Sequence, residues 1–324
     1  MEQFPITDKE AWLKQRTKDI TSTEVSALFN LSPYTTRFEL WHKKNTGDIQ
    51  EIEPNERMFW GTHLEEAIAT GIAEQNGWTI RPLKSYIRDP GARVGSSFDY
   101  KIIDPTATVT ATSNGKEMRL ENPLALLEIK NVDGLVFRNS WKKTEAGTVE
   151  APPHIELQVQ HQMLVAGVDT AYIGALVGGN TVYLMKRDKN DDICNSIMEK
   201  VGEFWESVDS NRPPQPNFEE ENDADFVISL CGAATPGLEI SLEDERTSRL
   251  VGVYKEASDQ VKAAELRKKA AKAELLTLLG DASKAYGPGF TISRGYTSEK
   301  VVESFTKKGF PTFRINYKKP SQGK

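Results

Sequence analysis

The sequence predicts an α/β fold followed by a helical carboxyl-terminal extension. Residues 124–129 form a mostly apolar run, which is typical of a strand near the middle of a sheet. Residues 54–75 place apolar side chains at mixed three- and four-residue spacing, the pattern of an amphipathic helix. Residues 250–278 repeat apolar side chains in alternating steps of four and three, which predicts a long helix.

Length and composition are those of an ordinary globular protein with one large core and an appendage. The 324 residues are 38% hydrophobic, and no stretch approaches the roughly 20 apolar residues of a membrane helix. The amino terminus lacks the basic and apolar regions of a signal peptide. Cys194 and Cys231 lie far apart, so we expect neither a disulfide framework nor a cysteine-ligated metal site. These features favour the reducing cytoplasm.

The net charge of -6 is unevenly distributed. Residues 213–245 contain nine acidic side chains and no lysine or arginine, which leaves a net charge of +3 on the rest of the chain. A DNA-binding body with an acidic linker is compatible with this distribution. We expect three parts: a domain over residues 1–216, an acidic linker over residues 217–242 and an extension over residues 243–324.

In chain order, the first helix is expected to begin near Thr21. Thr21 and Glu24 have the spacing of a capping box. The free N–H groups and positive dipole end of a helix amino terminus bind phosphate, here with Thr23 and the nearby Arg16. On this segment alone, the simpler interpretation of a cap that binds no ligand is favoured.

Two helices and two strands follow. Glu65 and Glu66 lie in the helix expected over residues 54–75, and one of them would point toward a metal site if that helix covered the sheet. Two adjacent helical carboxylates are, however, usually solvated. The expected helices span residues 38–44 and 54–75, and the expected strands span residues 79–88 and 93–103.

A hairpin is expected between these strands and the apolar run. Residues 106–112 alternate threonine with apolar side chains, and Asn114-Gly115 is a turn signal. Residues 118–120 would return toward the sheet. We expect this hairpin to project from the sheet edge.

The apolar run ends in a polar pair. Glu128 and Lys130 share one face of the strand, while Ile129 turns into the core. With Asp99 on an earlier strand, the carboxylates suit Mg²⁺ or Mn²⁺, and the ammonium can orient an attacking water. The alternative is the solvated face of an edge strand, and the short motif taken alone favours this alternative because it is common.

The residues after Lys130 are basic and aromatic. Arg138, Trp141 and Lys142 are candidates to track a DNA backbone and stack on a base. Phe137 and Trp141 are four residues apart, so they equally fit one apolar face of a helix.

A helix over residues 155–167 carries three glutamines. Gln158 and Gln162 share a face, and Gln160 lies around it, so their amides suggest donors aimed at water, metal ligands or DNA. The elements expected to complete this domain are strands over residues 171–177 and 182–187 and a helix over residues 192–209.

The extension is expected to hold the long helix and a small β unit. Lys268 occupies the one position missing from the apolar repeat of residues 250–278. This helix either packs on its own domain or forms an intermolecular coiled coil. Residues 289–294 and 312–317 are expected to be strands.

Five short motifs occur in a characteristic order within residues 12–216. They are Arg16 seven residues before Thr23 in an Ile-Thr-Ser-Thr-Glu-Val context, Trp60-Gly-Thr-His-Leu-Glu65, Ser97-Phe-Asp99, Glu128-Ile-Lys130 and Gln158-Val-Gln160. In this order they resemble the lambda exonuclease and YqaJ-type viral recombinase family of the PD-(D/E)XK nuclease superfamily. The combination is far more specific than any one motif.

The resemblance implies a restriction-endonuclease-like core with a mixed central β-sheet flanked by helices. It also implies a 5′-to-3′ exonuclease that acts on linear double-stranded DNA and leaves 3′ single-stranded tails for recombination by strand annealing. The implied partners are duplex DNA with a 5′-phosphorylated end, a single-strand annealing protein and further copies of the chain, as in a trimeric ring. Such a chain would be encoded by a phage or prophage and act in the bacterial cytoplasm.

Roles follow from the same resemblance. Asp99, Glu128 and the Ile129 carbonyl would hold a metal ion, and Glu65 would lie near a second Mg²⁺ or Mn²⁺, two ions per active site. Lys130 would position the water. Gln158 would support Lys130. The implied phosphate- or DNA-binding residues are Arg16, Thr23, Ser22 and Gln160. Glu66 is the second choice to Glu65, and Gln160 is the second choice to Gln158.

Alternatives remain open on sequence alone. Tyr100 stands where the family commonly has glycine, and the hairpin lengthens the separation between Asp99 and Glu128. A related PD-(D/E)XK endonuclease or repair nuclease would carry the same catalytic set. A DNA-binding assembly subunit without activity would have no use for that set.

Overall fold

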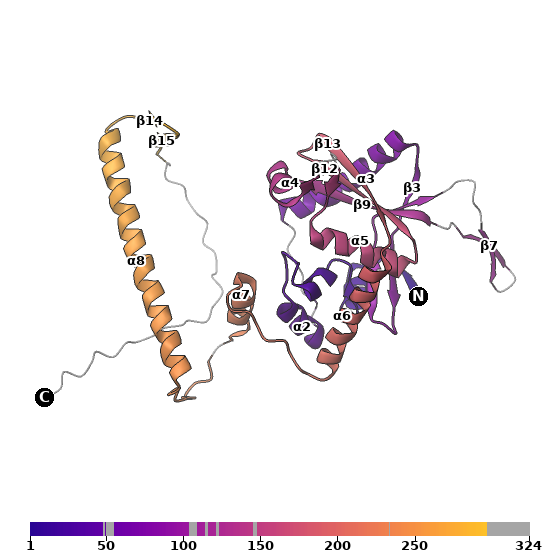
Figure 1. Cartoon of the computed structure of the whole chain (residues 1–324), viewed down its shortest axis with the longest axis horizontal. Helices are drawn as coiled ribbons and strands as arrows, with labels where there is room; N and C mark the ends of the chain where they lie inside the picture. Colours follow the sequence, from indigo (N-terminus) through magenta and orange to yellow (C-terminus); the bar gives the residue numbers. More distant parts are fainter. Residues whose placement is uncertain are drawn as a thin grey trace. The chain divides into compact units, whose positions relative to one another are not determined.

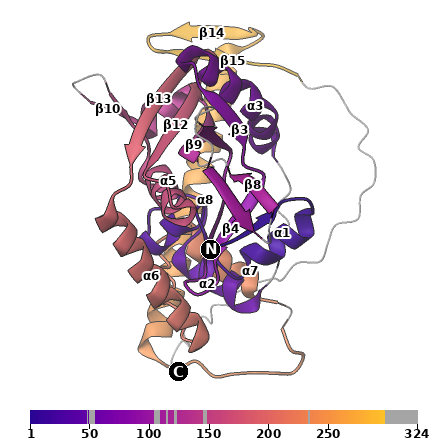
Figure 2. The same cartoon turned by 90° about the vertical axis from the view of Figure 1, so that its right-hand side faces the viewer.

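The chain folds into two compact units, Met1–Ser229 and Leu230–Lys324, which are described separately. The computed structural model (Figures 1 and 2) describes residues 1–47, 49, 55–103, 109–113, 116–120, 123–144, 148–232 and 234–296. Across these residues, no helix is long and apolar enough to cross a membrane. Cys194 and Cys231 are both free.

A five-stranded sheet forms the centre of the first unit, in the order β13-β12-β9-β6-β3. Strand β9 runs parallel to β12 and antiparallel to β6, and the remaining pairs are antiparallel. The predicted mixed sheet is therefore confirmed, with the apolar run as its middle strand. The strands are β3 (Thr79–Pro82), β6 (Tyr100–Ile103), β9 (Pro123–Val132), β12 (Thr170–Val177) and β13 (Thr181–Asp188).

Helices cover both faces of this sheet. Helix α3 (Glu56–Asn76) packs on one face, where Ile72 joins Leu127 and Ile129 in one apolar cluster. A Cβ at Gly174 of β12 would overlap the Ile72 side chain, so glycine lets α3 approach closely. On the other face, α5 (Pro153–Ala166) and α6 (Asp191–Asp209) share a second cluster with Leu126. Strand β9 therefore sends alternate side chains to α3 and to α5.

A second, four-stranded sheet has the order β1-β4-β5-β2 and holds a buried ion pair. Arg88 donates to both carboxylate oxygens of Asp19, at 2.7 and 2.8 Å, and Tyr86 donates to Asp19 at 3.0 Å. Asp19 is fully buried. A Cβ at Gly95 would overlap the Tyr86 hydroxyl, so only glycine fits beside this pair. The strands are β1 (Glu2–Pro5), β2 (Ile20–Thr21), β4 (Ser85–Asp89) and β5 (Val94–Ser97).

The expected helix after Thr21 is instead a five-residue 3₁₀ helix, η1 (Val25–Phe29), which ends at Asn30 in the left-handed region. Thr21 lies in β2, and its N–H and hydroxyl both donate to the Glu24 carboxylate. The contact between Thr21 and Glu24 was predicted correctly from their spacing. The short 3₁₀ helix is stabilised by burial of four of its five residues. It is flanked by α1 (Lys9–Arg16) and α2 (Arg37–Thr46).

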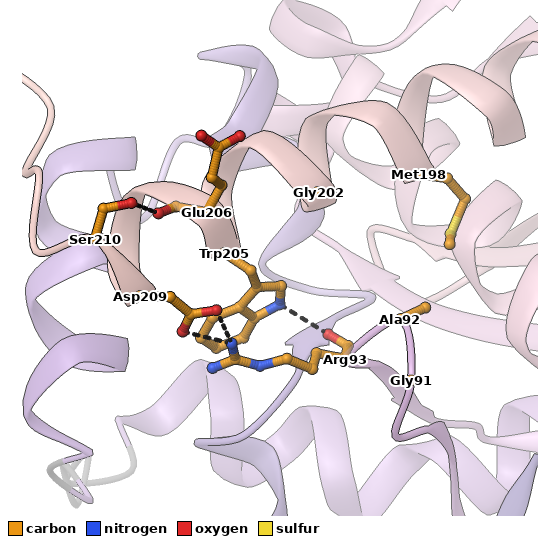
Figure 3. Close-up of a pocket in the computed structure, with 9 residues that line it drawn as sticks. All are labelled: Gly91, Ala92, Arg93, Met198, Gly202, Trp205, Glu206, Asp209 and Ser210. Carbon is orange, nitrogen blue, oxygen red and sulfur yellow. Dashed lines mark hydrogen bonds and ion pairs between the residues drawn. The ribbon is translucent and has the colours of Figure 1, made fainter.

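A surface pocket of about 540 Å³ lies between α6 and the turn that joins β4 to β5 (Figure 3). Arg93 lies over the Trp205 ring at 3.4 Å and bonds the Asp209 carboxylate at 2.8 Å. Trp205 donates its indole N–H to the Arg93 carbonyl at 3.1 Å. These contacts fasten the end of α6 to the four-stranded sheet.

The hairpin forms a two-stranded sheet of its own, β7 (Val109–Ser113) with β8 (Lys116–Leu120). Its Asn114-Gly115 turn lies outside the described residues. After β9 come α4 (Gly134–Ser140) and the short pair β10 (Lys142–Lys143) and β11 (Val149–Glu150).

The acidic segment expected to be a linker contains helix α7 (Glu221–Leu230). Buried Asp223 accepts hydrogen bonds from the Thr36 hydroxyl and, at 2.6 Å, from the Asn217 N–H. Phe226 contacts the Phe38 ring edge to face. This end of the segment thus packs on α2 within the first unit.

The second unit contains α8 (Glu245–Leu279) and a hairpin of β14 (Lys284–Gly287) with β15 (Phe290–Ser293). The expected helical extension with a small β unit is confirmed. Strand β14 was not expected from the sequence, and the expected strand over residues 312–317 lies outside the described residues.

Candidate active site

Asp99 and the end of β9 meet at the edge where β6 begins. Asp99 lies between β5 and β6, and its carboxylate accepts a hydrogen bond of 2.8 Å from the Ile129 N–H. The N–H and C=O of one strand residue point to the same side, so the Ile129 carbonyl turns toward Asp99 as well. Two of the predicted oxygen ligands are thereby adjacent.

Glu128 is buried and is the centre of a polar network on the α5 face of the sheet. Its carboxylate accepts from Lys130 Nζ at 2.5 Å and from Gln158 Nε2 at 2.6 Å on one oxygen, and from Gln162 Nε2 at 2.7 Å on the other. Lys130 also donates to Gln158 Oε1 at 3.2 Å. Glutamines four residues apart on α5 therefore hold both oxygens of one carboxylate.

The charges in this network are unbalanced. Burial raises the pKa of Asp99 well above its ordinary value, and the negative charge of Glu128 raises it further. Burial would lower the pKa of Lys130, but Glu128 and Asp99 outweigh it and raise that pKa, so Lys130 remains an ammonium. The single ammonium of Lys130 thus offsets the charge of both Glu128 and Asp99.

Glu65 approaches this network from α3, on the opposite face of the sheet. Burial and the charge of Glu128 raise the pKa of Glu65. The neighbouring Glu66 is exposed. Between the two adjacent carboxylates, the structure therefore brings Glu65 toward the site.

The donor set fits a hard divalent cation in its chemistry. Asp99, Glu128, the Ile129 carbonyl and Glu65 offer only oxygen, which Mg²⁺ and Mn²⁺ prefer. Burial first, and then the charge of Glu128, raises the pKa of Asp99 and of Glu65, and a bound cation would lower both pKa values. Within the described ranges, however, no three acidic, cysteine or histidine side chains already converge as a metal site.

A second polar cluster contains the predicted phosphate-binding pair. Arg16 Nη2 donates to the Thr23 hydroxyl at 3.2 Å, and Thr23 is exposed. Buried Lys44 bonds Glu24 at 2.8 Å and the Arg16 carbonyl at 2.8 Å. Burial opposes ionisation of Glu24, yet Lys44 and Arg16 hold its pKa below the ordinary value.

A short series of contacts connects this cluster to the carboxylates. Arg16 lies over the Trp12 ring at 4.8 Å, and Trp12 donates to the Ser97 hydroxyl at 2.9 Å. The Ser97 carbonyl accepts from Gln162 Nε2 at 3.4 Å, and Gln162 reaches Glu128. The two predicted half-sites therefore lie in one continuous polar region.

Three predicted contact residues are placed elsewhere. Gln160 is buried, donates to the Asp188 carbonyl at 3.0 Å and accepts from the Asn190 N–H at 2.8 Å, so it joins α5 to the start of α6. Trp141 is buried and stacks on Phe137, although it lies just after the last residue of α4. Ser22 is buried and accepts a hydrogen bond from Ser96. In the described residues these three side chains are bonded or packed inside the protein, and DNA contact through them stays a prediction.

Arg138 and Lys142 are exposed on α4 and β10, where DNA contact stays a prediction. Gln162 was missed as a site residue, although its four-residue spacing from Gln158 was the available signal. Lys44 was missed as well, since nothing local in the sequence connects it to Glu24.

Solved structures with a related arrangement include the alkaline exonuclease LHK-Exo from Laribacter hongkongensis. It is 18% identical, with a TM-score of 0.47 over 69% of this chain and 100% of that chain. A phage-related exonuclease from Haemophilus somnus 129PT is 10% identical, with a TM-score of 0.39 over 59% of this chain and 94% of that chain. At these scores we draw no argument from either likeness.

Sequence comparison is more specific. Protein YqaJ from Bacillus subtilis strain 168, which is uncharacterized, is 28% identical over 200 residues, or 61% of this chain. The match spans 55% of the length of that relative. The model of the YqaJ-like viral recombinase domain matches residues 11–169, which contain the Arg16–Thr23 pair, Asp99, the end of β9 and α5. Over these residues the chain is similar to the YqaJ-like viral recombinase domain.

Proposed function

We propose that the chain is a divalent-metal-dependent DNA exonuclease that digests one strand of a linear duplex from its 5′ end. The observation that carries the proposal is the position of Asp99, on the Ile129 N–H, next to buried Glu128, which bonds Lys130 and Gln158. A protein that only binds DNA gains nothing from burying carboxylates with so little compensating charge, because their desolvation lowers stability.

The chain's own residues have distinct tasks under this proposal. The bound Mg²⁺ or Mn²⁺ would supply Lewis-acid activation of water and neutralise phosphate charge. Asp99, Glu128 and the Ile129 carbonyl would hold it, with Glu65 on the far side. Lys130 would orient the attacking water through its ammonium.

Gln158 and Gln162 keep the carboxylate of Glu128 in place. Each amide donates to a different carboxylate oxygen, so rotation of the side chain would break one of the two hydrogen bonds. When a metal takes one oxygen, the amide on the other can still hold the side chain. Such support of a ligand by a neighbouring hydrogen bond fixes its direction.

The preferred end of the substrate would be set by the Arg16 and Thr23 pair. A guanidinium beside a hydroxyl binds a terminal phosphate through charge-assisted hydrogen bonds. The contacts through Trp12, Ser97 and Gln162 connect this pair to Glu128. A 5′-phosphate held there would place the first phosphodiester near the carboxylates.

The wider setting follows from the family. By likeness to the viral recombinase domain, the chain would leave 3′ single-stranded tails and work with a single-strand annealing protein. Association of the first unit into a homo-oligomer, such as a trimeric ring, belongs to the same proposal, as does action in the cytoplasm of a bacterial host.

The test is digestion of a linear duplex with one 5′-phosphorylated and one 5′-hydroxyl end, each strand carrying its own label. With Mg²⁺ we expect preferential loss of the phosphorylated strand from its 5′ end. Lys130→Ala should lower the rate by at least about 100-fold, the usual worth of a group that orients or transfers a proton. Arg16→Ala should remove the preference for the phosphorylated end while digestion continues.

The matched control is Lys186→Ala, which removes an exposed lysine that pairs with Asp188. It should digest at the normal rate. Cleavage at internal sites or of circular duplex would favour the endonuclease alternative. Absence of metal-dependent cleavage in the wild-type chain, or full activity in Lys130→Ala, would overturn the proposal.

A further inference from the structure

Helix α8 carries an apolar stripe that is exposed to water within its own unit. All 35 of its residues are described, and of these only Leu279 is buried. Leu250, Val261 and Leu275 are 56%, 58% and 44% exposed. Because helices in proteins are stabilised mainly by packing of an apolar face, such a stripe indicates a partner.

The stripe follows the heptad repeat of a coiled coil. Helices that pair this way place apolar residues at the alternating first and fourth positions, and one polar residue among them fixes the register. The first positions are Tyr254, Val261, Lys268 and Leu275, and the fourth positions are Leu250, Ala257, Ala264, Ala271 and Leu278. Lys268 is the single charged residue in this set.

We propose that α8 pairs with α8 of a second copy of the chain, in antiparallel orientation. The register places Leu250 opposite Leu275 of the second copy and Val261 opposite Ala264. An antiparallel pair brings a first position of one helix against a fourth position of the other. The paired stretch is roughly 38 Å long at the rise of an α-helix.

Side-chain volumes favour the antiparallel orientation. In the proposed register, Tyr254 faces Ala271, Lys268 faces Ala257 and Val261 faces Ala264, so every alanine meets a larger residue. A parallel pair would place alanine on alanine in three layers and Tyr254 on Tyr254 in another. Layers of even volume fill space without cavities, which protein interiors require.

Charges favour the same orientation. A parallel pair would bring Lys268 of both copies together in the interface and Arg267 next to Lys272. The antiparallel pair separates these cations, because Lys268 meets Ala257 and Arg267 meets Gln260. The Lys268 ammonium can then reach water past the small alanine.

The test cross-links full-length chains at single cysteines in a Cys231→Ser background, where the remaining Cys194 is buried. One chain carries Leu250→Cys and the other carries Leu275→Cys. They are produced separately and also together in one cell, and each sample is treated with a short bis-maleimide. In an antiparallel pair, identical cysteines lie roughly 38 Å apart and out of reach.

We expect at least about tenfold more cross-linked dimer from the co-produced chains than from either chain alone, because only the mixed pair brings the thiols within the reach that helix length allows. Mass spectrometry should find the peptides of positions 250 and 275 joined. Leu266→Cys, on the outer face of the helix, is the matched control and should not cross-link.

Three results would overturn the proposal. Cross-linking of Leu250→Cys alone would show parallel pairing. Equal cross-linking of Leu266→Cys would show contact without register. No cross-linking in any sample would show that another surface, such as the first unit of the same chain, covers the stripe. Association through the first unit does not imitate the expected result, since that result requires two different positions of α8.

Discussion

The Glu128 network and helix α8 use burial in opposite ways. In the first, charged and amide groups are removed from water, and each oxygen of Glu128 has a donor within 2.7 Å. In the second, leucine and valine side chains remain in water along a 35-residue helix. The first arrangement lowers stability, and the proposed metal-dependent catalysis gives a reason for it. The second leaves apolar surface exposed, and the proposed pairing of two α8 helices gives a reason for that.

The two regions also differ in how many neighbouring elements hold them in place. The carboxylates are held by strands and helices from both faces of one sheet, so a change in any of these elements would move the site. Helix α8 depends on its own repeat, so single changes on its outer face should do little. Substitutions in the first unit and on the outer face of α8 should therefore differ in their effect on stability.

The largest effect is expected for Arg88→Met, which leaves buried Asp19 without its cation. Loss of one partner from a buried ion pair lowers the free energy of unfolding by about 3 to 5 kcal/mol. Urea unfolding followed by tryptophan fluorescence measures it, because all six tryptophans lie within residues 1–229 and report on the first unit alone.

The control for this change is Glu2→Gln. The Glu2 carboxylate lies 3.7 Å from Arg88 Nη1 and is half exposed, so its loss should change stability by less than about 1 kcal/mol. Equal effects of the two substitutions would show that the Asp19–Arg88 pair does not support the four-stranded sheet.

A second effect depends on pH and on His161 of α5. Burial lowers the pKa of His161 to about 4, with only partial opposition from Glu24 and the Ile20 backbone. Neither ring nitrogen has a hydrogen-bond partner of good geometry in the described chain. The folded state therefore resists a proton that the unfolded state accepts below its ordinary pKa of about 6.5. Stability should fall as the pH decreases from about 6.5 to about 4.

His161→Leu removes this titration. Between pH 7 and pH 5, the free energy of unfolding should fall by about 2 kcal/mol more in the wild-type chain than in the variant. Urea unfolding at both pH values measures the difference. The same loss in both chains would mean that His161 is protonated, or hydrogen-bonded, in the folded state.

The smallest effect is expected for Leu266→Ala on the outer face of α8. Leu266 is 69% exposed, and surface substitutions of this kind change stability by less than about 0.5 kcal/mol. Circular dichroism at the helix band during thermal unfolding measures it in the full chain. A large loss of helix stability would show that the outer face, rather than the heptad stripe, is the packed one.

The sequence predicted most of what alternation and spacing control. The middle strand, the long helices and the sharing of a face by Glu128 and Lys130 follow from periods of two and 3.6 residues, which are local properties. The Thr21–Glu24 contact was also anticipated from spacing, although the element that follows is only η1.

What the sequence did not predict depends on distant contacts. The three glutamines of α5 look alike in the chain, yet Gln158 and Gln162 reach Glu128 while Gln160 reaches Asp188 and Asn190. Only the packing of α5 against the sheet and α6 distinguishes them. Trp141 was similarly ambiguous, because an exposed stacking ring and a buried one have the same local pattern.

The alternation of β9 also limits how this protein can change its length during evolution. Leu127 and Ile129 fill the core beneath α3, and Glu128 faces α5 between them. One residue inserted within β9 would send the apolar side chains to the polar network and the carboxylate into the core. Between Asp99 and Glu128, insertions and deletions are therefore tolerable only before the strand begins. The separate β7–β8 sheet occupies that interval, so its length can vary while the register of β9 is inherited unchanged.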